Sequence, residues 1–305
     1  MTSKTLITGW NGFFGSILCK AQESFNISLV RCGRVKGSDV TCDLSKAVPQ
    51  IPDTVDRVIH SAGVTPNASR PHNTKDIFQT GNVTSTKNLL ASLNPQNIKS
   101  FVLISSASVY GMVSGENILE TATLSPTSEY GKSKLEVEKL VIKWCQQNNV
   151  PYTIVRLPLV VGPGAPGTLG QLVKAIESKR FVIPGSGDAR KSMVLATDVA
   201  DWITNHPVSY GIFNLTDQTD PSYAELCDAI TEHLNFKPVP RIPLTIMMVG
   251  SWVGDIAQTL LKRPIPYNSN VHVQLTETLT FSSKAAANHG WSPNSVISNK
   301  EVWLK

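Results

Sequence analysis

Tyr130 and Lys134 are the two side chains whose type and spacing point most directly to chemistry. They lie four residues apart in the segment Tyr130-Gly131-Lys132-Ser133-Lys134, and residues four apart on a helix share a face, so both can reach one ligand. A free tyrosine titrates near pH ~10, but an adjacent ammonium stabilises the phenolate. The pair therefore predicts that Tyr130 acts as a general acid and base and that Lys134 lowers its pKa.

A serine upstream could complete this catalytic set. Ser106 lies four residues before Tyr110, at the end of the apolar run that begins at Phe101. Its hydroxyl would donate a hydrogen bond to a substrate oxygen as negative charge develops there. Ser105 is one residue away and is the alternative for this role.

A glycine-rich turn, TGxxGxxG, follows the first apolar run. Gly9 permits the tight turn, Gly12 lets the backbone approach a pyrophosphate, and Gly15 lets a helix pack on the strand. The free N–H groups at the start of that helix favour bound phosphate. The turn predicts a dinucleotide site that includes Gly9, Asn11, Gly12, Phe13, Phe14 and Gly15.

Two arginines indicate which dinucleotide is bound. The run 27–31 ends in Arg31, and Arg34 follows three residues later with no acid immediately near. An arginine at this place accommodates the 2′-phosphate of NADP, whereas NAD sites carry an acid that binds the ribose hydroxyl. We therefore predict NADP(H). The alternative is that both arginines are solvated surface charges.

The elements that must position these groups follow from the alternation of short β-branched runs with helical patterns. The runs 5–8, 27–31, 39–42, 57–62, 100–106 and 152–157 alternate with helices expected at 12–24, 83–93 and 130–147. This alternation predicts an α/β fold, a Rossmann-type doubly wound parallel sheet. After residue 158 the pattern breaks into loops and separate helices. We assign residues 1–157 and about 192–215 to an NADP-binding domain, and about 158–191 and 216–305 to a smaller C-terminal substrate lobe.

Composition limits the class of partner. The net charge of +5 is spread along the chain, so it favours anionic ligands without predicting nucleic-acid binding. Five cysteines without CxxC spacing predict neither a disulfide framework nor a metal site. No signal-peptide pattern opens the sequence, so a cytoplasmic location is expected. The apolar segment 243–261 contains Asp255 and Gln258, which favours a half-buried helix over a membrane span and predicts no membrane partner.

The segment 101–111, FVLISSASVYG, followed by the Tyr130 to Lys134 motif, resembles the extended short-chain dehydrogenase/reductase family of sugar-nucleotide epimerases, dehydratases and ketoreductases. The resemblance implies that Ser106, Tyr130 and Lys134 are catalytic and that Lys134 also binds the nicotinamide ribose. It also implies a homodimer. Further cofactor contacts are expected at Asp43, Leu44, Ser61, Ala62, Gly63, Asn82 and Pro158.

Three of these neighbouring polar residues have simpler alternatives. Asp43 is expected at the adenine, or else only forms a turn. Asn82 resembles the structural Asn of the family, or else only caps the next helix. His60 is expected as a packed wall of the cofactor site rather than a base.

The second lobe carries basic residues where the family binds a nucleotide diphosphate. Lys179, Arg180, Arg190 and Lys191 surround the loop 184–187, and their charges suit a diphosphate, although a solvated basic rim is the alternative. Pro158 and Leu159 stand where many epimerases carry an Asn. We therefore predict an NADPH-dependent ketoreductase that acts on a nucleotide-activated 4-keto-6-deoxysugar. The alternatives are a nucleotide-sugar epimerase, a reductase of a non-nucleotide carbonyl compound, and a catalytically silent NADP-sensing regulatory protein.

Overall fold

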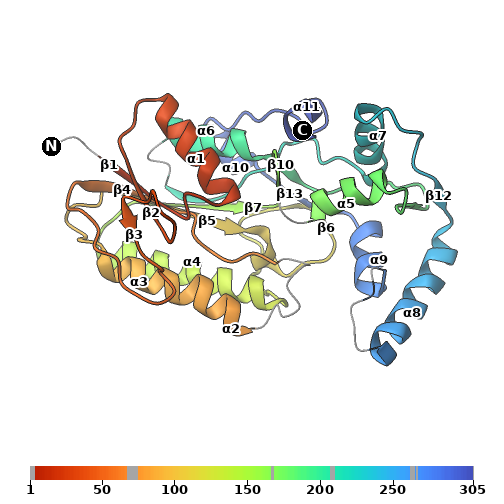
Figure 1. Ribbon diagram of the computed structural model, residues 1–305, viewed down its shortest axis with the longest axis horizontal. Helices are drawn as coiled ribbons and strands as arrows, with labels where there is room; N and C mark the ends of the chain where they lie inside the picture. The colour runs from red at the N-terminus through yellow and green to blue at the C-terminus, as the bar shows by residue number, and fades with distance from the viewer. Residues whose placement is uncertain are drawn as a thin grey trace.

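A seven-stranded parallel sheet forms the centre of the structure (Figure 1). The computed structural model describes residues 4–66, 75–165, 168–206, 210–261, 265 and 267–304. In spatial order the strands are β11 (Gly211–Asn214), β7 (Tyr152–Leu157), β5 (Ser100–Ser106), β4 (Val55–His60), β1 (Lys4–Thr8), β2 (Leu29–Gly33) and β3 (Val40–Thr41). The order reverses direction at β1, and open α/β sheets bind ligands at such a switch point. The predicted Rossmann-type fold is confirmed.

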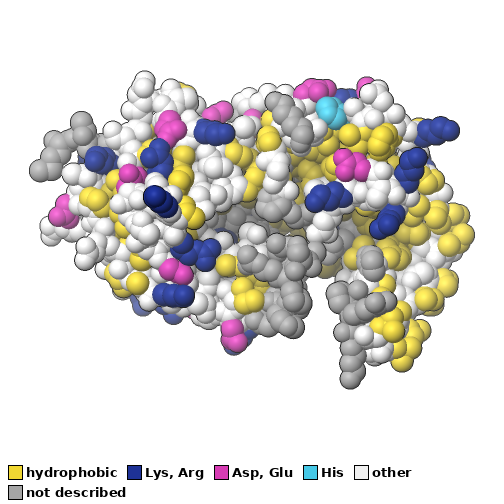
Figure 2. Space-filling model, in the orientation of Figure 1, with side chains coloured by type: hydrophobic (Ala, Val, Ile, Leu, Met, Phe, Trp, Pro, Cys, Tyr) yellow, Lys and Arg dark blue, Asp and Glu magenta, His cyan; other side chains and the backbone are white. Residues whose placement is uncertain are grey.

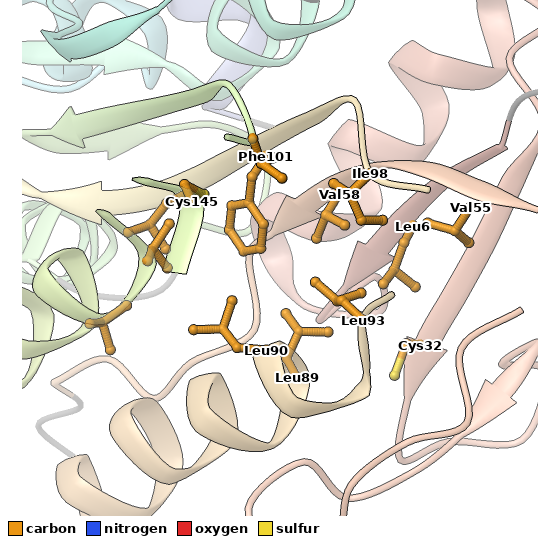
Figure 3. Packing of buried hydrophobic residues seen from close by; sticks show 14 of the residues in the cluster. Leu6, Cys32, Val55, Val58, Leu89, Leu90, Leu93, Ile98, Phe101 and Cys145 are labelled. Carbon is orange, nitrogen blue, oxygen red and sulfur yellow. The ribbon is translucent and has the colours of Figure 1, made fainter. Parts of the chain in front are cut away.

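Helices cover both faces of this sheet. One face packs against α1 (Phe13–Ser24) and α6 (Ala196–Asn205), while the other packs against α3 (Ser85–Ser92) and α4 (Glu129–Gln147). Neighbouring residues of each strand alternate between the two faces, so Leu6 belongs to the α3–α4 side and Ile7 to the α1–α6 side. Figure 3 shows the α3–α4 side, where Leu89 and Leu90 point toward Phe101 and the strand side chains.

The helical segment that precedes β5 differs from the prediction. The expected helix 83–93 is in fact the last part of a longer helical stretch, α2 (Lys75–Phe78), a π-helical turn η1 (Gln79–Thr84) and then α3. Asn82 therefore lies inside this stretch and does not cap a helix. A π-helical turn is rare and often marks a functional site.

A second lobe lies beyond the carboxyl end of the sheet. Three short parallel pairs support it: β8 (Leu159–Val161) with β10 (Met193–Leu195), β9 (Ile183–Pro184) with β12 (Arg241–Ile242), and β6 (Gly115–Ile118) with β13 (Leu279–Phe281). Its helices are α5 (Thr168–Glu177), α7 (Tyr223–His233), α8 (Leu244–Leu261), α9 (Ser269–Thr276) and α11 (Lys300–Trp303), while α10 (Lys284–Ala287) and the 3-10 turn η2 (Ala107–Tyr110) adjoin the sheet. Side chains from α5, α7 and β10 share one apolar core in this lobe.

Helix α8 contradicts the expectation of a half-buried helix. Its large apolar side chains are mostly exposed, and within the helix only Ser251 and Gly254 are buried. By length and composition it is the one helix, among the residues that the structure describes, that could cross a membrane. Hydrophobic side chains accordingly gather at the lower right of the molecule, over α8 (Figure 2).

Candidate active site

A cleft of about 770 Å³ opens at the carboxyl ends of β1, β2 and β4, where the strand order reverses. Gly9 has φ +70°, and a Cβ there would lie 2.7 Å from the Cα of Ala62. A Cβ at Gly15 would lie 2.1 Å from the Gly9 carbonyl oxygen, so only glycine lets α1 begin this close to β1. These two positions have the backbone roles that the glycine motif predicts.

The N-terminus of α1 suits a phosphate group. Gly12 is the N-cap, no side chain accepts a hydrogen bond there, and the first turn holds no acidic residue. The first N–H groups of a helix have no partner within the helix, and they carry its positive dipole. Because Gly12, Phe13, Phe14 and Gly15 all line the cleft, these donors can serve the pyrophosphate of a dinucleotide.

Most of the predicted cofactor residues meet at this cleft. Asn11, Arg34, Asp43, Leu44, Ser61, Ala62 and Gly63 line it together with the residues of the glycine turn. The predicted contacts Arg31, Asn82, Tyr130, Lys134 and Pro158 are not among its lining residues. The cleft also includes Ser45, Val64, Thr65 and, in η1, Thr80, which sequence reasoning missed because these isolated positions carry no motif.

Arg31 does not have the surroundings that the sequence suggested. Its guanidinium forms an ion pair with Glu23 of α1, lies 3.9 Å from an Asp39 carboxylate oxygen, and sits 5.9 Å from the centre of the Trp10 ring. The expectation that no acid lies near this arginine is therefore wrong. Arg34, which lines the cleft, is the better placed of the two predicted cations.

Asp43 forms the turn expected as its simpler role, and it also lines the cleft. Its carboxylate accepts hydrogen bonds from the backbone N–H and the hydroxyl of Ser45, at 3.1 and 2.6 Å, and so forms a turn. The hydroxyl of Ser45 lowers the pKa of this carboxyl, and the charges of Arg34 and Lys46 lower it further. Asp43 stays ionised on the wall of the cleft.

The structure brings Tyr130 and Ser106 together. Tyr130 lies in the first turn of α4, and its ring packs 5.6 Å from the ring of Phe78. Burial raises the pKa of Tyr130, while a hydrogen bond with Ser106 opposes that rise; the lowering by Lys134 that the sequence predicted is not seen. Ser105 instead donates a 2.5 Å hydrogen bond to Glu138 on the buried side of α4. Ser106 is therefore the serine that a substrate oxygen beside Tyr130 would meet.

Lys134 lies one turn after Tyr130 and is almost fully buried. Its Nζ donates a 2.5 Å hydrogen bond to the backbone carbonyl of Ile104 in β5. Burial lowers the pKa of Lys134 to about 8, although the charge of Glu138 favours the ammonium. This lysine can therefore exchange a proton near neutral pH.

Beneath Lys134 lies a buried ionic network that the sequence did not reveal. Glu138 and Arg156 form a bidentate pair at 3.1 and 2.9 Å, with side chains only 1% and 2% exposed. Arg156 also donates to the Tyr110 hydroxyl at 3.1 Å, and that hydroxyl donates to Asn214 at 2.8 Å. The network joins α4 to β7 and β11. Tyr130, Lys134 and Glu138 follow one another at four-residue spacing. This spacing is the sequence signal that could have placed Glu138 on the same helix face as Lys134.

His60 and Asn82 hold the elements around the cofactor cleft. His60 is buried between the hydroxyls of Thr8 and Thr86, at 2.7 and 2.9 Å. Burial lowers its pKa to about 3, so it is neutral; it is packed inside the domain and is not among the lining residues of the cleft. Asn82 donates to Ser133 of α4 at 2.9 Å and accepts from the Val64 N–H at 2.6 Å. It fixes the loop after β4 against α4.

The four predicted basic residues of the lobe have different environments. Lys179 and Arg180 are exposed at the end of α5. Arg190 donates to the Asp220 carbonyl at 3.0 Å and to Glu225 at 3.3 Å, so its charge is already engaged. Lys191 is half-buried, and burial lowers its pKa to about 8 while Glu277 opposes the shift. Among the described residues no carboxylate lies within ion-pair distance of Lys191, so it is the best placed of the four to bind an anion.

The Tyr130–Lys134 pair predicts a pH dependence. The fully protonated pair loses its first proton with the pKa of Lys134, about 8. The form that has lost one proton includes the phenolate beside an ammonium, which is the active base. Activity in the direction that needs a base should therefore rise through about pH 8. In Lys134→Met the rise should move above pH ~10, because Tyr130 must then titrate alone in a buried site. The measurement is kcat/KM against pH. Lys132→Met, an exposed change on the same helix, is the control, and an unshifted profile in Lys134→Met would contradict the pairing.

Comparisons with known proteins agree with this geometry. A family model described as "NAD dependent epimerase/dehydratase family" matches residues 5–214. The chain is 25% identical, over 95% of its length and 91% of the relative's, to the N-acetyl-alpha-D-glucosaminyl-diphospho-ditrans,octacis-undecaprenol 4-epimerase of Escherichia coli O157:H7.

Two solved structures share the fold. The UDP-glucuronic acid 4-epimerase of Bacillus cereus, solved with UDP-glucuronic acid and NAD, superposes with a TM-score of 0.71 at 20% identity, covering 99% of this chain and 98% of that one. The human epimerase family protein SDR39U1, solved with NADPH, gives 0.73 at 17% identity, covering 98% of each chain.

Proposed function

Because this chain belongs to the NAD dependent epimerase/dehydratase family, we propose that it is an epimerase that inverts C4 of a sugar carried on a diphosphate. The observation that carries the proposal is that Tyr130 shares a hydrogen bond with Ser106, one helix turn before the buried Lys134, in a fold whose glycine turn and α1 line a dinucleotide cleft. The similarity to a 4-epimerase over 95% of the chain supports it. The epimerase thus takes precedence over the ketoreductase that the two arginines first suggested.

The residues of the site fit the proton transfers of this reaction. Tyr130 takes the proton of the sugar 4-hydroxyl, and Ser106 donates a hydrogen bond to the same oxygen as it becomes a carbonyl. Lys134 stabilises the phenolate and is in place to bind the nicotinamide ribose. A nicotinamide dinucleotide held at the glycine turn would supply the reversible redox chemistry at C4 that an inversion requires. Tyr130 returns the proton to the C4 oxygen once the sugar presents its opposite face.

The substrate class rests on the second lobe. Lys191 is half-buried and has no carboxylate within ion-pair distance among the described residues, as expected of a side chain that binds a diphosphate. A diphosphate sugar can end in a nucleotide or in a polyprenol, as in the name of the similar Escherichia coli enzyme. The test is to incubate the enzyme with UDP-glucose, UDP-N-acetylglucosamine, UDP-glucuronic acid and undecaprenyl-diphospho-N-acetylglucosamine, and to follow the C4 epimer by NMR. Formation of no C4 epimer from any of them would refute the proposal.

Replacement of Lys191 should weaken substrate binding without affecting the cofactor. A charge-assisted hydrogen bond contributes about 1.5 to 3 kcal/mol, so Lys191→Met should raise KM for the sugar diphosphate about tenfold or more. Lys179→Met, which removes an exposed lysine, is the matched control. An unchanged KM in Lys191→Met would show that Lys191 does not bind the substrate and that the basic residues of the lobe form a solvated rim.

A second candidate, the NADPH-dependent ketoreductase, is favoured by one observation. Arg34 lines the cleft just after β2, where a 2′-phosphate would lie. A reductase would consume one NADPH for each product formed, whereas an epimerase leaves the nicotinamide pool unchanged. Following the absorbance of NADPH with a 4-keto-6-deoxysugar nucleotide distinguishes the two.

Cofactor preference should depend on Arg34 and not on Arg31. We propose that Arg34 binds the 2′-phosphate and that NADPH binds about tenfold more tightly than NADH, since this exposed contact is worth about 1.4 kcal/mol. Arg34→Ala should abolish that preference, and salt should weaken it. Arg31→Ala is the matched control and should leave the ratio unchanged, because its guanidinium pairs with Glu23. If the wild type bound NADPH and NADH with equal affinity, Arg34 would have no role in cofactor choice and NAD would be the cofactor.

A further inference from the structure

The exposed face of α8 has no role in the proposed reaction. Six large apolar side chains, each between 54% and 76% exposed, form it: Ile246, Val249, Trp252, Val253, Ile256 and Leu260. Most of them recur at the spacing of one helix face. Monomeric soluble proteins rarely expose a continuous apolar surface of this kind, and such surfaces mark interaction sites.

Three polar residues of the same helix, Ser251, Asp255 and Gln258, face inward. The Asp255 carboxylate accepts from the backbone N–H and the hydroxyl of Ser269, at 3.2 and 2.5 Å, and the side-chain oxygen of Gln258 accepts from Asn268 at 3.3 Å. Gly254 is buried against the backbone of Tyr267, whose carbonyl oxygen would lie 2.0 Å from a Cβ at that position. The helix thus turns its polar side to the protein and its apolar side outward, the reverse of an ordinary surface helix.

The charges around α8 identify the kind of partner. Between Glu232 and Glu277 the sequence holds one acidic residue, the inward Asp255, and four basic ones, Lys237, Arg241, Lys262 and Arg263. Lys237 and Arg241 are exposed just before the helix. Lys262 and Arg263 follow it in sequence and lie outside the described residues. An apolar face between basic flanks complements a bilayer of anionic lipids. A second copy of the chain would instead bring like charges together.

We propose that α8 docks this protein on the surface of an anionic membrane, with its apolar face buried at the boundary of headgroups and acyl chains. The helix lies along the membrane and does not cross it. Before the helix, Arg241 and Ile242 pair with β9, and after it the chain runs back alongside α8, where Ser269 contacts Asp255. Crossing would also place Asp255 and Gln258 in hydrocarbon, where polar groups are costly.

This placement deepens the proposed function, on which the next step rests. The Leu244 side chain at the start of α8 packs against Gly185, in the loop 184–187 among the basic residues of the lobe. A docked α8 therefore holds the substrate lobe at the membrane surface. The substrate class that fits is a sugar diphosphate anchored in the bilayer by a lipid.

Vesicle flotation without substrate tests the docking separately from catalysis. The full-length protein is mixed with vesicles of phosphatidylcholine alone, or of phosphatidylcholine with phosphatidylglycerol, at low and high salt. The α8 variant combines Trp252→Ser, Ile256→Ser and Leu260→Ser. The control combines Phe25→Ser, Val48→Ser and Val113→Ser, which changes equally exposed apolar side chains elsewhere. All these side chains are exposed, so neither variant should unfold, and circular dichroism checks this.

The wild type and the control should float with the anionic vesicles, and the α8 variant should bind at least about tenfold less, because it loses three of the six apolar side chains of the face. High salt should weaken wild-type binding. The α8 variant should keep its turnover of a soluble nucleotide sugar, if the wild type accepts one. A wild type that stays with the soluble fraction, or an α8 variant that floats as well as the wild type, would overturn the proposal. The proposal would also be overturned if the wild type does not bind the vesicles and instead forms a dimer, seen by analytical ultracentrifugation, that the α8 changes dissociate.

Discussion

Tyr130→Phe should lower turnover by about 10² or more, because it removes the only proposed proton donor and leaves the shape of the site unchanged. Dinucleotide affinity should stay close to that of the wild type, since the cleft that binds the phosphates is formed by the glycine turn and the start of α1. The measurements are single-turnover kinetics and a fluorescence titration of NADH and NADPH.

The matched control for this change is Tyr152→Phe. Tyr152 is half-buried and begins β7, so it lies at the amino end of the strand, opposite the edge that carries the site. It should keep wild-type turnover. If Tyr130→Phe also retained wild-type turnover, the assignment of Tyr130 as acid and base would be wrong.

Removal of one partner of the Glu138–Arg156 pair should destabilise the protein by about 3 to 5 kcal/mol, because it leaves an unpaired charge in the core. The two side chains are 1% and 2% exposed, so water cannot replace the lost contacts. Urea unfolding of Glu138→Gln and of Arg156→Met measures the effect.

Two comparisons make this result specific. Glu129→Gln removes the exposed ion pair with Lys132 on the same helix, and it should cost less than about 1 kcal/mol. The double variant Glu138→Gln with Arg156→Met should cost less than the sum of the single changes, since it leaves no charge unpaired. Losses that simply add would show that the two residues do not act as a pair.

The nucleotide-binding half was predictable because its signals are local. The β-branched runs and the glycine turn specify β1, the turn and α1 within a few residues, and the expected helices 12–24 and 130–147 match α1 (Phe13–Ser24) and α4 (Glu129–Gln147) closely. The order of parallel strands then follows from short right-handed crossovers. The cleft lies where the motif and the switch point require it.

The environments of charged residues could not be predicted in the same way. Arg31 meets Glu23 and Asp39 only because α1 and the loop before β3 return to the end of β2. Arg156 and Glu138 likewise come from different elements, a strand and a helix. Sequence patterns give the elements, but the pairing of side chains across them depends on the tertiary packing.

Helix α8 shows a different limit. An apolar segment broken by Asp255 and Gln258 predicts a helix that buries its apolar side, because apolar side chains are usually inside. The structure reverses the orientation, since the polar groups contact Ile265, Asn268 and Ser269. Periodicity shows that a helix has two faces, but it does not show which face meets the protein.

The fate of the hydrogen at C4 tests the central proposal most directly. A diphosphate sugar that the enzyme converts is prepared with deuterium at C4 and incubated in ordinary water with a small amount of dinucleotide. We expect both epimers to keep the deuterium at C4, with no net oxidation or reduction of the nicotinamide, because the same hydride leaves and returns within one active site. Loss of the deuterium to solvent, or consumption of one NADPH for each product, would contradict C4 epimerisation by Ser106, Tyr130 and Lys134.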